Sequence, residues 1–117
     1  MKKIFVTLAL VGLLVTATGA FAQDKGNGKA GGAGVAAAGK EVFESNCAVC
    51  HNADSTERKM GPGLKGLFQR AELANKKKVS DASVIAIINE GGNGMPPFGD
   101  VINAKEKADV LAYLKSL

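Results

Sequence analysis

The residues that could carry chemistry in this 117-residue chain lie together in one short segment, Cys47-Ala48-Val49-Cys50-His51. It holds both cysteines and the single histidine of the chain. Two thiols three positions apart, followed directly by an imidazole, are typical of covalent attachment of a c-type haem. Each thiol forms a thioether with a haem vinyl group, and the histidine supplies one axial ligand of the iron. The segment therefore predicts one haem c, attached through Cys47 and Cys50 and ligated by His51.

Three other uses of these residues fit the sequence less well. A disulfide between the two cysteines would close a very short loop and add little stability. A thioredoxin-like redox pair requires a βαβ context, and the chain shows no such pattern. A zinc site normally takes four ligands, whereas the chain offers two cysteines and one histidine.

The first 22 residues have the pattern of a secretory signal peptide. Lys2 and Lys3 precede an uncharged, mostly apolar run that ends in small residues at Ala20 and Ala22, the positions that a signal peptidase recognises. We expect cleavage after Ala22 and export to the periplasm. An uncleaved membrane anchor is the alternative, although the run is near the lower limit for crossing a bilayer.

The segment after the signal contains little that a core could bury. Residues 23–38 are rich in Gly, Ala and Lys and predict a flexible tail, with helix allowed to begin at 35–38. Two of the 15 Lys and Arg residues but none of the 11 acids lie in the signal, so the mature chain carries a net charge of only +2. With one Tyr and no Trp, this balance gives no support to nucleic-acid binding.

Helical periodicity without any strand-like alternation predicts an all-α domain over residues 39–117. The first helix is expected over 39–47, where an apolar stripe leads into Cys47. A short helix is expected near Lys65 or over 71–75.

Two further helices carry N-terminal capping residues. Ser80 is a suitable N-cap for a helix over 81–90, which two glycines then end. Asn103, with Glu106 three residues later, forms a capping-box pattern before the amphipathic C-terminal segment.

A second axial ligand of the iron must come from another residue type, because no second histidine exists. A methionine thioether is the common partner and raises the reduction potential. Met60 lies only nine residues after His51, too near to reach the opposite face of the haem easily. Met95 lies beyond a whole predicted helix, next to Pro96 and Pro97, which stiffen the backbone. We therefore expect Met95 as the ligand and Met60 as a core filler or packing at the haem edge.

Taken together, the spaced motifs over residues 39–117 resemble those of a class I c-type cytochrome of the small bacterial, single-haem kind. The matching motifs, besides the haem segment, are Gly39-x-x-x-Phe43-x-x-x-Cys47, Gly61-Pro62-x-Leu64, Gly94-Met95-Pro96-x-Phe98 and Val110-x-x-Tyr113. The resemblance implies the cytochrome c fold, with about four helices around one covalently attached haem. It implies that Tyr113 packs on Gly39 and Phe43 and that the Pro62 carbonyl accepts a hydrogen bond from His51, which would orient the ring. The stretch from Leu67 to Ser80 is shorter than in the long members of the family, which leaves part of the haem edge less covered.

An iron with two protein ligands has no free position for a substrate, so we expect one-electron transfer rather than an enzyme. The partners would be transient redox proteins, met by a monomer through small contacts. Exposed lysines around the haem edge could steer an acidic partner, although such lysines are often ordinary surface: Lys59, Lys65, Lys76, Lys77 and Lys78.

Two alternatives remain open from the sequence. A haem c subunit of a dehydrogenase or terminal oxidase complex would have the same haem site. A five-coordinate haem enzyme or sensor would require that Met95 does not bind the iron.

Overall fold

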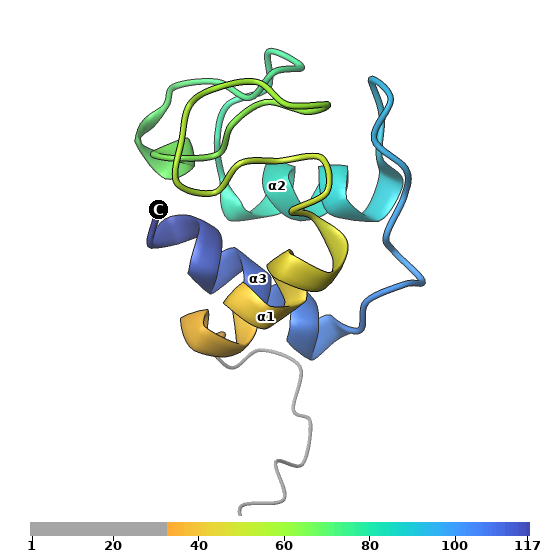
Figure 1. Cartoon of the computed structure of the whole chain (residues 1–117). Coiled ribbons are helices and arrows are strands. Elements are labelled where there is room, and N and C mark those ends of the chain that lie inside the picture. The colour runs from red at the N-terminus through yellow and green to blue at the C-terminus, as the bar shows by residue number, and fades with distance from the viewer. Residues whose placement is uncertain (1–32) are drawn as a thin grey trace, which may run out of the picture.

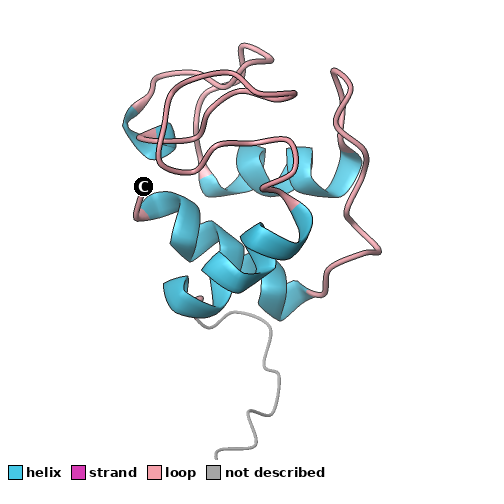
Figure 2. Cartoon of the chain, viewed as in Figure 1, coloured by secondary structure: helices cyan, strands magenta, loops and turns pink. Residues whose placement is uncertain are grey.

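The computed structural model describes residues 33–117, and the expected signal peptide and most of the expected tail lie outside this range. It contains α1 (Ala36–Asn46), the short 3-10 helix η1 (Leu67–Gln69), α2 (Asp81–Glu90) and α3 (Ala104–Lys115), joined by long loops (Figures 1 and 2). Within residues 33–117 there is no strand beyond two isolated bridges. The all-α class is therefore confirmed, with three α-helices and η1 as the helical elements. None of the described helices is long and apolar enough to cross a membrane.

The closest helix packing joins α1 and α3, which cross each other in Figure 1. Gly39 lies at the crossing, where a β-carbon would overlap the carbonyl group of Asp109. One turn later, the Phe43 ring meets the Tyr113 ring edge to face, with centroids 5.5 Å apart and an interplanar angle of 61°. Val110, beside the crossing, is only 1% exposed. The absence of a side chain at Gly39 thus allows the two backbones to approach and the aromatic pair to form, as the resemblance implied.

The N-terminus of α1 receives its cap from α3. The N-cap residue Val35 makes no side-chain cap of its own, and its N–H donates to Oδ1 of Asp109 at 2.8 Å. Lys105 donates to the other carboxylate oxygen at 2.7 Å. Burial raises the pKa of Asp109, but the hydrogen bonds from Lys105 and Val35 and the charge of Lys105 outweigh it, so the pKa lies below its usual value of 3.8. The ionised carboxylate therefore stabilises the first turn of α1.

Replacing Asp109 by asparagine is expected to lower the free energy of unfolding by about 1 kcal/mol at neutral pH, because the charge-assisted pairing with Lys105 is lost. Because the pKa is depressed in the folded state, the stabilisation is complete above pH 3.8 and is lost as the pH falls through the lower folded-state pKa. Urea unfolding of both holoproteins across this range should show their stabilities converging in acid. A difference that persists at low pH would contradict a role for the charge.

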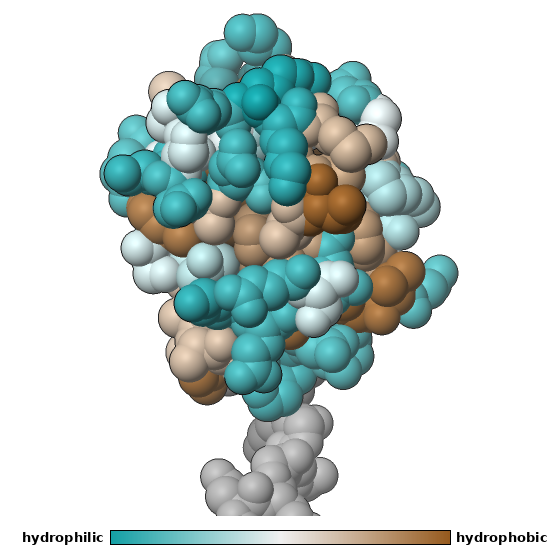
Figure 3. Space-filling model, viewed as in Figure 1, coloured by the Kyte–Doolittle hydropathy of each residue, from teal (hydrophilic) through white to brown (hydrophobic). Residues whose placement is uncertain are grey.

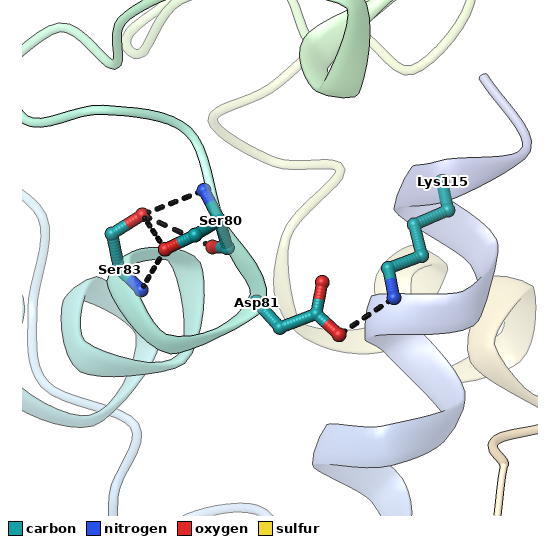
Figure 4. A network of polar contacts seen from close by, with 4 residues as sticks. All are labelled: Ser80, Asp81, Ser83 and Lys115. Atoms are coloured by element: carbon teal, nitrogen blue, oxygen red, sulfur yellow. Dashed lines mark hydrogen bonds and ion pairs between the residues drawn. The ribbon is translucent and has the colours of Figure 1, made fainter.

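Reciprocal capping sets the start of α2. Ser83 N–H donates to Oγ of Ser80 at 3.1 Å, and Ser80 N–H donates to Oγ of Ser83 at 2.9 Å (Figure 4). The next residue, Asp81, accepts a hydrogen bond from Lys115 at 2.7 Å (Figure 4), which ties the start of α2 to the end of α3. On its inner side α2 buries Val84 in a core of seven apolar side chains: Phe43, Leu67, Leu73, Val84, Ile102, Val110 and Leu114.

Candidate haem site

The Cys47–His51 segment forms a tight turn at the end of α1. Cys47 is the C-cap, and its N–H donates to the carbonyl oxygen of Phe43 at 2.7 Å. The carbonyl oxygen of Cys47 then accepts the N–H groups of Cys50 at 3.0 Å and His51 at 2.9 Å. The turn presents both half-buried cysteines and the histidine from adjacent positions, and neither cysteine forms a disulfide. This is the arrangement that attachment of one haem edge through two thioethers requires.

The following loop fixes the orientation of His51. Its Nδ1 lies 2.8 Å from the carbonyl oxygen of Pro62 and donates to it, which leaves Nε2 free. Gly61 packs against the ring so closely that a β-carbon would overlap it, and its N–H donates to the carbonyl oxygen of Cys50 at 2.8 Å. The hydrogen bond between His51 and Pro62 that the resemblance implied is therefore present. A second-shell bond of this kind selects the tautomer whose other nitrogen can bind a metal.

Met95 lies on the loop between α2 and α3, in a tight turn closed at its ends. Gly92 N–H donates to the carbonyl oxygen of Met95 at 2.9 Å, and Met95 N–H donates to that of Gly92 at 3.0 Å. The turn uses positive φ angles at Gly92, Asn93 and Gly94, which glycine and asparagine adopt most readily. The half-buried Met95 side chain lines the same cavity as the two cysteines and His51.

Met60 also borders that cavity, but it is 71% exposed. Its Sδ lies 3.8 Å from Sγ of Cys50, on the loop that carries Gly61 and Pro62. The interpretation of Met60 as a core filler is therefore wrong. Its position beside Cys50 agrees with the other expectation, packing at the edge of the haem.

The cavity bounded by these residues has a volume of about 750 Å³, within the range of cofactor pockets. Most of its lining is apolar: Leu64, Leu67, Leu73, Val84, Ile87, Ile88, Phe98, Val110 and Leu114. On the face seen in Figure 3, apolar residues gather across the middle of the molecule between polar surfaces. The cavity is also lined by the four residues expected to hold the haem, Cys47, Cys50, His51 and Met95. These side chains and the apolar walls together fit a covalently attached haem.

Burial and the neighbouring Cys50 raise the pKa of the Cys47 thiol to about 11. A thiol that stays protonated at neutral pH is a poor nucleophile. This disfavours the thiol-redox interpretation of the segment. Thioether formation removes the titrating proton altogether.

Sequence reasoning missed the polar residues of this cavity. Arg58, Arg70 and Asn75 line it, and Nη2 of Arg70 is held by the carbonyl oxygens of Gly63 at 2.8 Å and Lys65 at 2.7 Å. A guanidinium fixed in this way is suited to pair with a haem propionate. These residues lie in loops without periodicity, and the only available signal was that both arginines flank the Gly61-Pro62 turn.

Comparison with known proteins agrees with this geometry. The family model described as cytochrome c oxidase, cbb3-type, subunit III matches residues 34–114. The chain belongs to the family of c-type cytochromes. Cytochrome c6 of Synechocystis sp. is 36% identical over 76 residues, which cover 65% of this chain and 60% of that protein. Cytochrome c6 of Nostoc sp. is 30% identical over 118 residues, which cover 97% and 92%. The structure of cytochrome c6 from the diatom Phaeodactylum tricornutum superposes with a TM-score of 0.57 at 30% identity, covering 71% of this chain and 93% of that one.

Family membership settles the cofactor and the general function. C-type cytochromes carry covalently attached haem c, and this cytochrome has one attachment segment, Cys47 to His51. The family transfers electrons, and the chain is not an enzyme. The predicted fold class and cofactor are thus confirmed.

Proposed function

We propose that this cytochrome is a periplasmic one-electron carrier whose haem iron is ligated by Nε2 of His51 and Sδ of Met95. One observation carries the proposal: the attachment cysteines, His51 and Met95 line a single apolar cavity. The hydrogen bond from His51 to Pro62 supports it, because it leaves Nε2 as the available nitrogen. The haem supplies the redox change, and the protein sets its potential through the axial ligands and the apolar surroundings.

Other residues of the protein would exclude water from the haem, balance its charge and keep its ligands in place. Leu64 and the other apolar side chains keep water from the haem faces, which favours the state of lower net charge at the iron. Arg70, held by two carbonyl oxygens, would balance a propionate. The backbone around His51 and Met95 is held by hydrogen bonds, so little rearrangement would accompany each change of oxidation state.

We expect partners to be redox proteins that dock briefly beside the haem edge. The five lysines named above, Lys59, Lys65, Lys76, Lys77 and Lys78, are all exposed, and Val49 and Met60 add exposed apolar surface near the cavity. A small contact of this composition favours rapid, salt-dependent association with an acidic partner. Export to the periplasm and cleavage after Ala22 remain part of the proposal, and the mass of the exported protein would test them.

A redox titration of the exported holoprotein, followed by visible spectra, tests the proposal. We expect a single reversible one-electron transition, a six-coordinate low-spin spectrum, and no rapid binding of carbon monoxide to the reduced form. Fast carbon monoxide binding would instead indicate an open iron position and favour the haem enzyme or sensor. Stopped-flow mixing of the reduced holoprotein with an acidic redox partner should give electron-transfer rates that fall steeply with salt.

The family match supports a second candidate, a haem c subunit within a larger oxidase complex, because the matching model is described as an oxidase subunit. Its haem site would have the same ligands. Isolation from membranes after mild solubilisation distinguishes the two: a carrier elutes alone, whereas a subunit copurifies with a larger complex in fixed proportion.

A further inference from the structure

The loop that carries Met95 is tied to α3 by one side chain. Nζ of Lys107, in the first turn of α3, donates to the carbonyl oxygen of Gly99 at 2.7 Å in a partly buried contact. Among the described residues, no other side chain hydrogen-bonds to the segment from 91 to 99. Figure 1 shows this segment passing from the end of α2 along the side of the molecule to α3.

Gly99 is also where the loop attaches to α2. Its N–H donates to the carbonyl oxygen of Asn89 at 3.2 Å, and the N–H of Phe98 donates to that of Ile88 at 2.8 Å. Both polar groups of Gly99 are therefore bonded, one to α2 and one to Lys107 of α3. The contact with Lys107 makes Gly99 a junction between the two helices.

A movement of Gly99 would be transmitted along the backbone to Met95 almost undiminished. Pro96 and Pro97 lie between them, and each proline fixes its own φ and restricts the residue before it. At its other end the loop is held to α2 by the N–H of Gly91, which donates to the carbonyl oxygen of Ile87 at 2.7 Å, and the paired backbone hydrogen bonds between Gly92 and Met95 stiffen the turn between them. The Met95 side chain thus projects from a short stiff span with one anchor at each end.

We propose that Lys107 is a positioning residue for the axial ligand, acting as a clamp that keeps Met95 Sδ at the haem iron. The proposal rests on the proposed function, in which Met95 is that ligand. A hydrogen bond from an ammonium group is roughly twice as strong as one between neutral groups, and its partial burial reduces competition from water. Without it, the junction at Gly99 loosens and the fraction of molecules with Met95 off the iron rises.

Binding of imidazole to the ferric holoprotein measures that fraction, because an external ligand binds only where Met95 has withdrawn. We expect Lys107→Met to lower the apparent Kd for imidazole by about tenfold. Lys107→Arg, which restores a cationic donor, should bring it back to within about twofold. Lys107→Gln gives a milder second variant, expected to shift the Kd in the same direction by less.

Lys115→Met is the matched control. Lys115 is also a lysine of α3 with a hydrogen bond of 2.7 Å, but its partner is Asp81 on α2, away from the Met95 loop. Its replacement removes the same charge and should leave the Kd unchanged. The clamp is overturned if Lys107→Met and Lys107→Gln both bind imidazole as the parent does, or if Lys115→Met shifts the Kd equally. If the parent shows no methionine–iron absorbance at all, the proposed function itself fails, which separates the two results.

Discussion

Replacing Gly39 by alanine is expected to lower the free energy of unfolding of the holoprotein by about 3 kcal/mol. The added β-carbon would overlap the carbonyl group of Asp109 and crowd the backbone N of Val110. These are helix backbone atoms, so α1 and α3 must move apart rather than adjust a side chain. The separation would weaken the contact of Phe43 with Tyr113 and open the core beside Val110. Alanine is the better helix former by about 1 kcal/mol, so the steric cost is larger than the net decrease in the free energy of unfolding that we expect.

Guanidinium unfolding of the holoprotein, followed by circular dichroism, measures this effect. Ser45→Ala is the matched control, because Ser45 lies on the exposed side of α1 and gains only helix propensity. We expect its stability to stay within about 0.5 kcal/mol of the parent. A Gly39→Ala protein equally close to the parent would mean that the helices can separate without cost, against the packing described above.

The elements with local signals could be predicted from the sequence. The helix expected over 81–90 is α2 with the same limits, and the capping box of Asn103 and Glu106 begins α3. In each case the capping side chain lies within three residues of the backbone group that it binds. Capping of this kind depends on short spacings that a sequence displays directly.

The elements with distant partners could not be placed in the same way. α1 begins at Ala36, inside the stretch 35–38 where the sequence allowed helix to begin, but no local signal showed that Asp109, 74 residues away, binds Val35. The short helix expected near Lys65 or over 71–75 is a single 3-10 turn, Leu67–Gln69. It follows a left-handed Gly66 (φ 67°). Arg70 binds carbonyl oxygens of the loop before it, and backbone hydrogen bonds such as that from Leu73 to Lys77 shape the loop after it.

The residues of the haem site also differ in whether the sequence alone could predict their roles. Covalent attachment of the haem requires this spacing of Cys47, Cys50 and His51, so the sequence alone displays it. The hydrogen bond from His51 to Pro62 was accessible only through the family resemblance. Arg70 and Lys107 act through carbonyl oxygens of loops, and such contacts depend on a fold that no short spacing reveals.

Replacing Met95 by alanine is expected to have the largest effect on the redox chemistry. The variant should lose the methionine–iron charge-transfer absorbance of the oxidised form. Its reduction potential should fall by an appreciable part of the roughly 0.8 V range that axial ligation spans. The thioether stabilises the reduced iron, and water or an external ligand would replace it. Stability should fall as well, because the Met95 side chain lines the cavity and its removal leaves unfilled space.

Met60→Ala is the matched control, since Met60 is the other methionine bordering the cavity. Its Sδ lies beside Cys50 on the loop that also carries the His51 partner Pro62, and its side chain is mostly exposed. We expect this variant to keep the charge-transfer absorbance and to change the potential little. Visible spectra and potentiometry of both holoproteins decide between the two methionines. Loss of the absorbance in Met60→Ala with its retention in Met95→Ala would reverse the assignment, and the clamp at Lys107 would then act on a loop without a ligand.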